Sequence, residues 1–247
     1  MIQLAKRALT GTRWEEPAKR LYSALTRHRN SLCDWQTIAI MRRVLHESSS
    51  CIDAGAFEGG MLRHMVRLAP RGRHLAFEPT PDKCGALVGA FPTVQVYPFA
   101  LGDSPSSARF YHMRDHPALS GLRRRLDDLP YERVEILSVT VESLDRVVPP
   151  EMTVSFIKVD VEGGELGVFR GGASTIRRCR PTIVFECGRG GANHFGTGPD
   201  EVFGFFQDVG LGVSLLGDRL ANRAPLSRAA FIEQYETGAN FYFVAHS

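Results

Sequence analysis

The stretch C-I-D-A-G-A-F-E-G-G, residues 51–60, has the order of a strand end, a tight turn and a helix start. An apolar entry leads to Asp53, Gly55 follows, a glycine pair closes the turn, and residues 61–68 have helical spacing. Glycine permits positive φ and close approach of a ligand, and a helix start presents free N–H groups. This arrangement opens nucleotide-binding α/β domains, although an ordinary turn can have the same composition.

The composition describes a globular chain with little electrostatic bias. Its 247 residues are 43% hydrophobic and 23% charged, which fits one large domain or a domain with a helical extension. The net charge of +3 is too small to indicate nucleic-acid binding.

Cysteine usage and hydropathy bear on the compartment. The five cysteines are scattered without metal-ligand spacing, which indicates a reducing compartment, and we expect the cytoplasm. No apolar run has the length of a membrane span, and residues 1–13 lack the continuous apolar segment of a secretory signal.

Predicted strands alternate with helices through most of the chain, which predicts an α/β fold with a mostly parallel sheet. The final strand follows a loop instead of a long helix, which favours an antiparallel last strand. Helical patterns fill residues 1–46, so we predict an N-terminal helical extension, residues 1–47, before a domain at 48–247. We expect strands at 49–53, 74–78, 93–97, 109–113, 134–141, 154–160, 182–186, 213–216 and 241–245, and helices at 82–90, 143–148, 165–177 and 200–209.

Residues 114–133 are polar and irregular, and we expect them to form a long loop with a role such as a lid. The loop contains a basic run, Arg123-Arg124-Arg125. We interpret this run as a solvated turn in preference to a grip for an anionic substrate.

Acids end four predicted strands: Asp53, Glu78, Asp160 and Glu186. Ligands of open α/β sheets bind beyond the carboxyl ends of the strands, so these acids form a coherent set. Glu78 follows Asp53 by 25 residues, at the position where a carboxylate accepts hydrogen bonds from both ribose hydroxyls of a nucleoside. The alternative for Glu78 is a helix-capping or solvated acid.

The glycine loop departs from the dinucleotide fingerprint. A G-x-G-x-x-G pattern would place glycine where Phe57 stands, which leaves the backbone less free to meet a pyrophosphate. Asp53 also suits a ligand with a positive amino group better than a dianion. S-adenosylmethionine has an amino group, a carboxylate and a ribose but no phosphate, so the loop favours that cofactor over a nicotinamide dinucleotide.

The second half of the chain carries the most specific pattern. I-K-V-D-V-E-G-G-E at 157–165 and P-T-I-V-F-E at 181–186 resemble the FkbM-type methyltransferase family. Two departures from the family pattern are Phe57, where Asn or His is frequent, and Ser143 in place of Thr; neither removes an expected charge. The resemblance covers about residues 48–247, with the remaining motifs in matching order at 53–59, 77–81, 100–103 and 142–145.

The resemblance implies a Rossmann-like class I methyltransferase that uses S-adenosylmethionine, with a seven-stranded, mostly parallel sheet and an antiparallel last strand. Family members typically O-methylate sugars, glycosylated natural products or other hydroxylated metabolites, so the implied partner is a small-molecule acceptor. By position, the implied cofactor residues are Asp53, Gly55, Ala56, Phe57 and Gly59 at the methionine part, Glu78 and Pro79 at the ribose, Ala100 and Leu101 near the adenine, and Asp160.

Methyl transfer to an alcohol needs a base for the acceptor proton, and Asp160 is the candidate, with Glu162 and Glu186 beside it. A second hypothesis is Mg²⁺ held by Asp160 and Glu186, which would lower the pKa of a coordinated hydroxyl. We do not favour metal, because the sequence shows no clear third ligand, although Asn193 or His194 could serve. A helix N-terminal position is the alternative role of Glu162, and it could be the whole role of Glu165.

Two other classes of function compete with this interpretation. A nucleic-acid N-methyltransferase would carry an Asp/Asn-Pro-Pro-aromatic motif where the chain has D-V-E-G at 160–163, and the near-neutral charge also disfavours it. A non-catalytic binding or scaffold domain is disfavoured by the intact acids at the strand ends. No motif specifies the acceptor or the oligomeric state.

Overall fold

The computed structural model describes residues 15–124, 133–192 and 195–247, with the backbone alone for residues 15–29. Arg125, Asn193, His194 and the predicted helical residues 1–14 lie outside this part of the chain. Among the described residues, no helix combines the length and the apolar content needed to cross a membrane.

Seven strands form one sheet in the order β3-β2-β1-β7-β8-β10-β9. All neighbours from β3 to β8 pair parallel, and β10 pairs antiparallel with both β8 and β9. The predicted class, a seven-stranded and mostly parallel sheet with an antiparallel last strand, is therefore confirmed. The strands are β1 (Ser50–Ala54), β2 (His74–Phe77), β3 (Val94–Tyr97), β7 (Val154–Val159), β8 (Thr182–Glu186), β9 (Gly212–Leu215) and β10 (Tyr242–His246).

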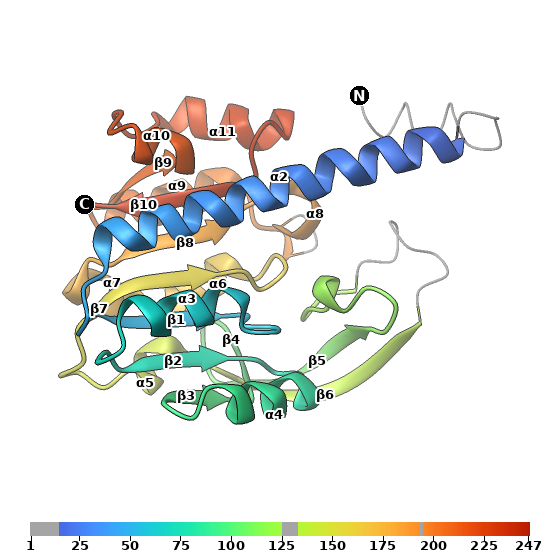
Figure 1. Ribbon diagram of the computed structural model, residues 1–247. Helices are drawn as coiled ribbons and strands as arrows, with labels where there is room; N and C mark the ends of the chain where they lie inside the picture. Colours follow the sequence, from blue (N-terminus) through green and yellow to red (C-terminus); the bar gives the residue numbers. More distant parts are fainter. Residues whose placement is uncertain (1–14, 125–132, 193–194) are drawn as a thin grey trace.

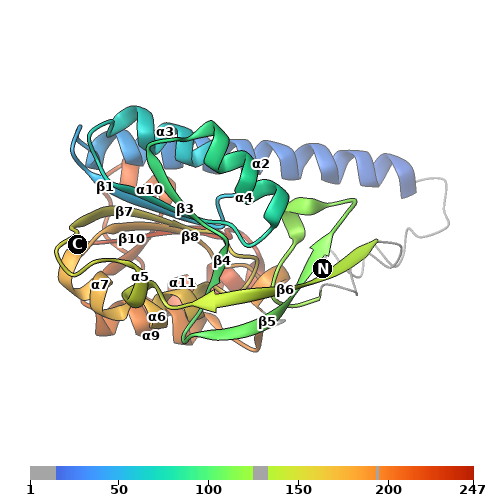
Figure 2. The same cartoon turned by 90° about the horizontal axis from the view of Figure 1, so that it is seen from below.

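Helices cover both faces of this sheet (Figures 1 and 2). A separate cluster of buried apolar side chains packs on each side of it. Strands β1, β7 and β8 are almost completely buried, because apolar residues face both helical layers. One face carries α2 (Glu15–Val44), α3 (Gly60–Leu68), α4 (Pro81–Ala90) and α10 (Leu216–Leu220); the other carries α5 (Leu144–Val147), α6 (Glu165–Gly171), α7 (Ala173–Cys179), α9 (Pro199–Asp208) and α11 (Arg228–Thr237).

Three helical segments differ from the predictions. The described part of the N-terminal segment is one continuous helix, α2, which runs past the body of the molecule at its N-terminal end (Figure 1). The predicted helix 165–177 is divided into α6 and α7 at Gly172. The last strand follows α10 and α11, whereas the sequence predicted a loop before it. The sequence did not reveal α11 because this helix buries only Phe231 and Tyr235 and therefore has no continuous apolar stripe.

A second, three-stranded sheet stands beside the large one. It has the order β4-β6-β5, from β4 (Phe99–Leu101), β5 (Ser106–Met113) and β6 (Val134–Glu142). The predicted loop 114–133 connects β5 to β6, and its described beginning folds back through the 3₁₀ turn η1 (Pro117–Leu119) and a bridge between Tyr111 and Gly121. The Arg123 guanidinium lies 5.6 Å from the centre of the Phe195 ring. This loop therefore returns toward the carboxyl ends of the parallel strands.

Candidate active site

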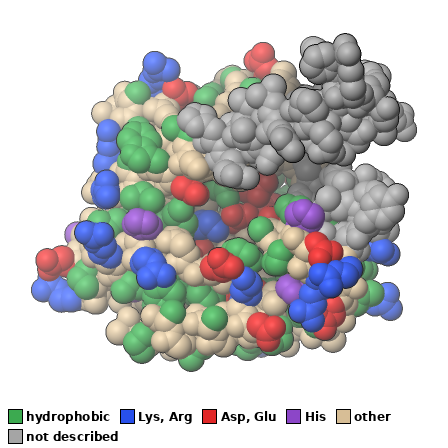
Figure 3. Space-filling view, turned by 45° about the vertical axis from the view of Figure 1, so that its right-hand side comes forward, with side chains coloured by type: hydrophobic (Ala, Val, Ile, Leu, Met, Phe, Trp, Pro, Cys, Tyr) green, Lys and Arg blue, Asp and Glu red, His purple; other side chains and the backbone are tan. Residues whose placement is uncertain are grey.

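A cavity of about 770 Å³ lies at the carboxyl ends of the parallel strands, where the order of the sheet reverses between β1 and β7. Figure 3 shows acidic side chains gathered in a hollow of the surface. Residues 117–120 and Leu122 of the β5–β6 connection supply part of the lining, as a lid would, whereas Arg123 does not. The sequence-predicted residues in the lining are Asp53, Gly55, Ala56, Phe57, Glu78, Pro79, Ala100, Leu101, Asp160, Glu162 and Glu186.

Among the predicted cofactor and catalytic residues that the structure describes, Gly59 is the one that does not line the cavity. It precedes α3 with φ of 76°, and a Cβ atom there would lie 2.5 Å from the Phe91 ring and 2.8 Å from Leu87. The helix start and the packing of α4 therefore require this glycine.

The glycine loop is fixed to the strands on both sides of β1. The N–H groups of Gly55 and Ala56 donate to the Phe77 carbonyl at 3.0 and 3.1 Å. Gly55 has φ of 78°, and a Cβ atom at this position would lie 1.9 Å from the Asp160 carbonyl oxygen. Only glycine permits this close approach, which brings the ends of β1 and β7 together.

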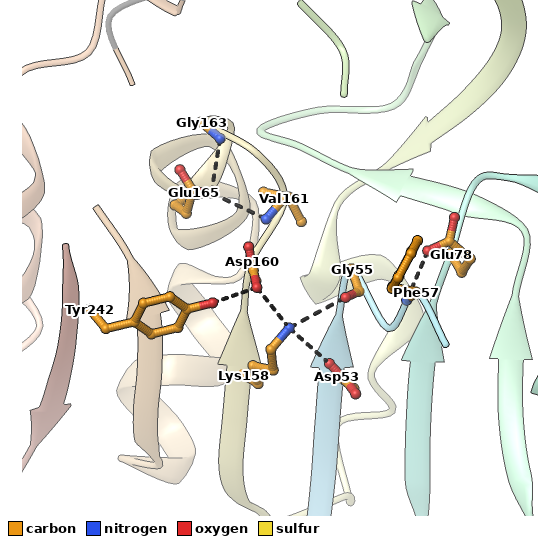
Figure 4. A network of polar contacts seen from close by, with 10 residues as sticks. All are labelled: Asp53, Gly55, Phe57, Glu78, Lys158, Asp160, Val161, Gly163, Glu165 and Tyr242. Carbon is orange, nitrogen blue, oxygen red and sulfur yellow. Dashed lines mark hydrogen bonds and ion pairs between the residues drawn. The ribbon is translucent and has the colours of Figure 1, made fainter. Parts of the chain in front are cut away.

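Glu78 is buried beyond β2, and backbone amides hold both of its carboxylate oxygens; Figure 4 shows the bond from Phe57. Phe57 N–H donates to Oε2 at 2.9 Å and Thr80 N–H donates to Oε1 at 2.8 Å. These bonds give Glu78 the capping function that was the alternative to ribose binding. Each carboxylate oxygen keeps a further lone pair, so Glu78, which lines the cavity, can still accept from a diol.

Asp53 is a buried carboxylate without a hydrogen-bond donor. Its side chain is 1% exposed, and neither oxygen has a hydrogen-bond partner. Lys158 Nζ approaches Oδ1 to 3.7 Å. Burial raises the pKa of Asp53 to about 6, against the lowering effect of the Lys158 charge. Such a group at the cavity wall calls for a cationic donor from a ligand.

Lys158 is the cation at the centre of the site (Figure 4). Its Nζ lies 3.2 Å from Asp160 Oδ2 and 3.4 Å from the Gly55 carbonyl oxygen. Burial would lower the pKa of Lys158, but the charges of Asp160 and Asp53 outweigh burial and raise it. Lys158 therefore stays protonated and ties β1, the glycine loop and β7 together.

Three carboxylates gather beyond β7 and β8. Single oxygens of Asp160, Glu162 and Glu186 all lie within 4.8 Å of one another. The Tyr242 hydroxyl donates to Asp160 Oδ2 at 2.5 Å. Burial would raise the pKa of Asp160, but the Lys158 charge and the hydrogen bonds from Tyr242 and Glu186 lower it. Burial and the charge of Asp160 raise the pKa of Glu186 well above its ordinary value.

Glu165 shapes the turn between β7 and α6. Its side chain is buried, and Oε1 accepts from Val161 N–H at 3.1 Å and Gly163 N–H at 3.0 Å. Burial raises the pKa of Glu165 to about 7. Glu165 thus stabilises the turn that presents Glu162, which has φ of 60°, and it does more than begin a helix.

The sequence reasoning missed Lys158, Tyr242 and Asp34. Lys158 lies within the quoted 157–165 motif, and a charge inside a strand otherwise buried was the signal that could have marked it. Tyr242 is marked only by its place opposite Glu186 across β10 and β8. Asp34 lines the cavity from α2, whose separation from the strands in sequence hides the contact.

Most of the chain matches the model of one protein family. Residues 53–211 match the family described as the methyltransferase FkbM domain. Among curated proteins, no sequence matches the chain significantly.

One solved structure shares the fold at low sequence identity, and two others align with lower scores. A crystal structure of methyltransferase FkbM from Methylobacillus flagellatus KT aligns with a TM-score of 0.51 and 14% identity over 82% of this chain. The alignment covers 44% of that protein, so this chain spans less than half of its length. A putative rRNA-methylase from Clostridium thermocellum aligns with a TM-score of 0.46 and 9% identity, over 86% of this chain and 94% of that one. A TehB-like SAM-dependent methyltransferase from Corynebacterium glutamicum aligns with a TM-score of 0.43 and 13% identity, over 93% and 97% of the two chains.

Proposed function

Because the chain belongs to the FkbM methyltransferase family, we propose that it transfers the methyl group of S-adenosylmethionine to a hydroxyl of a small acceptor, namely a sugar, a glycosylated natural product or another metabolite. The observation that carries this proposal is Asp53, a buried carboxylate at the cavity wall with no hydrogen-bond donor. A ligand ammonium group satisfies it, and a phosphate would be repelled by it.

The residues of the cavity fit this cofactor. Asp53 would hold the amino group, and the loop from Gly55 to Phe57 would surround the methionine part. Glu78 would accept from the ribose hydroxyls with its free lone pairs, next to Pro79. Ala100 and Leu101 offer an apolar surface for the adenine. When bound, the cofactor supplies an activated methyl group, so the protein mainly aligns the acceptor and receives its proton.

Asp160 is the residue that we assign as the proton acceptor, with Glu162 and Glu186 around it. Its carboxylate is ionised at neutral pH, because Lys158 and Tyr242 stabilise the charge. As the acceptor oxygen gains the methyl group, its O–H bond breaks and the proton passes to Asp160. The proton then leaves to water, and the site returns to its initial charge.

The charge of the cavity favours a neutral or amino-bearing acceptor. Asp34, Asp160, Glu162 and Glu186 line the side that we assign to the acceptor. These acids outnumber the two basic residues of the lining, Arg189 and Lys158, and Lys158 is already engaged by two carboxylates. A phosphorylated substrate would be repelled there. The same argument weighs against a nucleic-acid methyltransferase, which stays the alternative and would bind RNA in a salt-sensitive manner.

Cofactor binding tests the proposal without knowledge of the acceptor. S-adenosylhomocysteine should bind in isothermal titration calorimetry and should raise the thermal midpoint, since a ligand at 100 times its Kd stabilises by about 2.7 kcal/mol. ATP and NAD serve as control ligands and should give neither effect. The absence of any shift at millimolar S-adenosylhomocysteine contradicts the proposal and favours a scaffold role.

Acceptor class is tested by release of S-adenosylhomocysteine in the presence of matched sugars. Neutral glycosides and amino sugars should be better acceptors than the corresponding sugar phosphates. We propose that this reaction takes place in the cytoplasm, in keeping with the five scattered cysteines of the sequence. Preferential methylation of sugar phosphates would contradict the charge argument.

A magnesium-assisted reaction is a second mechanism that the geometry of the three acids allows. Glu162 supplies the third oxygen ligand that the sequence did not show, beside Asp160 and Glu186. We do not favour metal, because the Lys158 ammonium already neutralises Asp160 at 3.2 Å. We therefore expect turnover to survive EDTA. A metal-assisted reaction would give a different result: EDTA would abolish turnover and added Mg²⁺ would restore it. Glu162→Gln would abolish turnover as well.

A further inference from the structure

The cavity has two walls that the parallel strands do not supply. One comes from α2, which lies before the matched residues 53–211, and the other comes from residues 114–124, the described start of the β5–β6 connection. Figure 2 shows α2 and the strands β5 and β6 on opposite faces of the large sheet. A ligand beyond the ends of β1 and β7 therefore lies between these two walls.

The wall from α2 is a polar stripe. Asn30, Cys33, Asp34 and Thr37 line the cavity, at the spacing that puts residues on one face of a helix. The stripe runs from the exposed Asn30 to Thr37, which is buried, so it leads from the mouth of the cavity inward. The next turn of α2 is fixed in the core through Ile40. Amide, carboxylate and hydroxyl groups on one face can bind several hydroxyl or amino groups of an acceptor.

The wall from the β5–β6 connection is mainly apolar. Pro117, Ala118, Leu119 and Leu122 line the cavity from this segment, with Ser120 as a polar side chain among them. Pro117, Leu119 and Leu122 are only half-buried in the free protein. They can therefore bury more apolar surface against a ligand, which stabilises the complex.

Hydrogen bonds fix this apolar wall next to the acids. Tyr111 and Gly121 exchange backbone N–H···O=C bonds at 2.8 and 3.3 Å, and the Ser120 hydroxyl accepts from a backbone amide of β5 at 3.0 Å. A Cβ atom at Gly121 would lie 3.3 Å from the Cβ of Glu162. The wall thus adjoins the turn that follows Asp160, the residue that we assign as proton acceptor, and it belongs to the acceptor side of the cavity.

We propose that the acceptor is amphipathic: its hydroxyl- or amino-bearing part lies along the α2 stripe, and an apolar group lies against Pro117, Leu119 and Leu122. This inference rests on the proposed function, within which an aryl glycoside fits the cavity better than the methyl glycoside of the same sugar. Asp34 is a specificity-determining residue for the polar part of the acceptor, and Leu119 is one for the apolar part.

Calorimetry on the protein saturated with S-adenosylhomocysteine tests this inference with matched pairs of probes. The pairs are the methyl and phenyl β-glycosides of glucose, galactose and glucosamine, so the contribution of the sugar cancels within each pair. The phenyl member should bind about 10-fold more tightly, because the apolar wall buries its ring. Leu119→Ser should reduce this preference by about 3-fold or more, whereas Leu119→Met, which keeps the apolar surface, should retain it. Asp34→Ala should weaken both members of a pair by about 10-fold, because a charged hydrogen-bond acceptor is lost.

Affinity for S-adenosylhomocysteine should stay unchanged in all of these variants and in two controls outside the cavity lining. Ile136→Ser removes an exposed apolar side chain of β6, and Asp103→Ala removes an exposed acid; neither should change the binding of any glycoside. Equal affinity within every pair, or no binding of any glycoside, overturns the inference. Weaker S-adenosylhomocysteine binding by Leu119→Ser also overturns it, since the apolar wall would then hold the cofactor. Failure of S-adenosylhomocysteine to bind the wild-type protein, before any glycoside is added, overturns the proposed function and this inference with it.

Discussion

Asp53→Asn should stabilise the free protein while it weakens cofactor binding. The pKa of Asp53 rises from 3.8 to about 6 in the folded state, because its side chain is completely buried. A shift of about two units corresponds to about 3 kcal/mol at a pH above both values. The amide still needs hydrogen-bond partners, so we expect a gain of about 1 to 3 kcal/mol in the free energy of unfolding at pH 8.

The pH dependence of this gain follows from the direction of the shift. Below the unfolded-state pKa of 3.8, Asp53 is protonated in both the folded and the unfolded state. The wild-type protein then avoids the free-energy cost of burying a charged carboxylate. As the pH rises through the folded-state value of about 6, that stabilisation is lost in the wild-type protein. Asn does not titrate, so the difference between variant and wild type should be close to zero near pH 4 and should reach its full size above pH 7.

Urea unfolding at several pH values measures the difference, and calorimetry with S-adenosylhomocysteine measures the cost to binding. Loss of a charged hydrogen-bond acceptor should weaken binding by about 10-fold to 100-fold. The exposed acid Asp103 provides the control, since Asp103→Asn should change neither quantity. A variant that is less stable than the wild type at pH 8, or a difference that does not grow with pH, would refute the reasoning.

Three further changes test other parts of the site. Gly55→Ala should lower the free energy of unfolding in urea by about 3 kcal/mol or more, because its Cβ would overlap the Asp160 carbonyl oxygen and its φ is 78°. In the control Gly85→Ala in α4, the new Cβ meets no atom, so this variant should be neutral or slightly stabilising. Asp160→Asn should lower kcat by about 10²-fold or more while S-adenosylhomocysteine binding in calorimetry largely persists, and full turnover would place the base elsewhere. Glu78→Gln should weaken S-adenosylhomocysteine about 10-fold or more, and unchanged affinity would leave Glu78 a capping residue only.

The strand ends could be predicted closely because each carries a local signal. A buried apolar run followed by an acid marks β1 and β7, and the structure ends both strands within one residue of the expected position. The helices without a dense apolar stripe were the ones missed. In α11 only Phe231 and Tyr235 are buried, so its sequence resembles a polar loop.

The sequence showed the glycines and acids at the strand ends as a group, but it did not show the structural role of each residue. Gly55 and Gly59 look equivalent in the turn, yet Gly55 allows contact with β7 and Gly59 allows packing of Phe91. Glu165 looked like a helix N-terminal acid, and it proves to hold the turn before α6 through two backbone amides. The difference lies in which atoms surround each residue, which sequence spacing does not contain.

The sequence by itself determined the class of fold, the family and the place of the cavity, because strand order and motif spacing put Asp53, Glu78 and Asp160 at one edge of a parallel sheet. Only the tertiary structure decided how the charges are shared. Tyr242 reaches Asp160 because the last strand runs antiparallel beside β8, and Lys158 lies between Asp53 and Asp160 because β1 and β7 are neighbours. Ion pairs and buried hydrogen bonds depend on distances in three dimensions, so they could be identified only after residues far apart in the chain had been brought together.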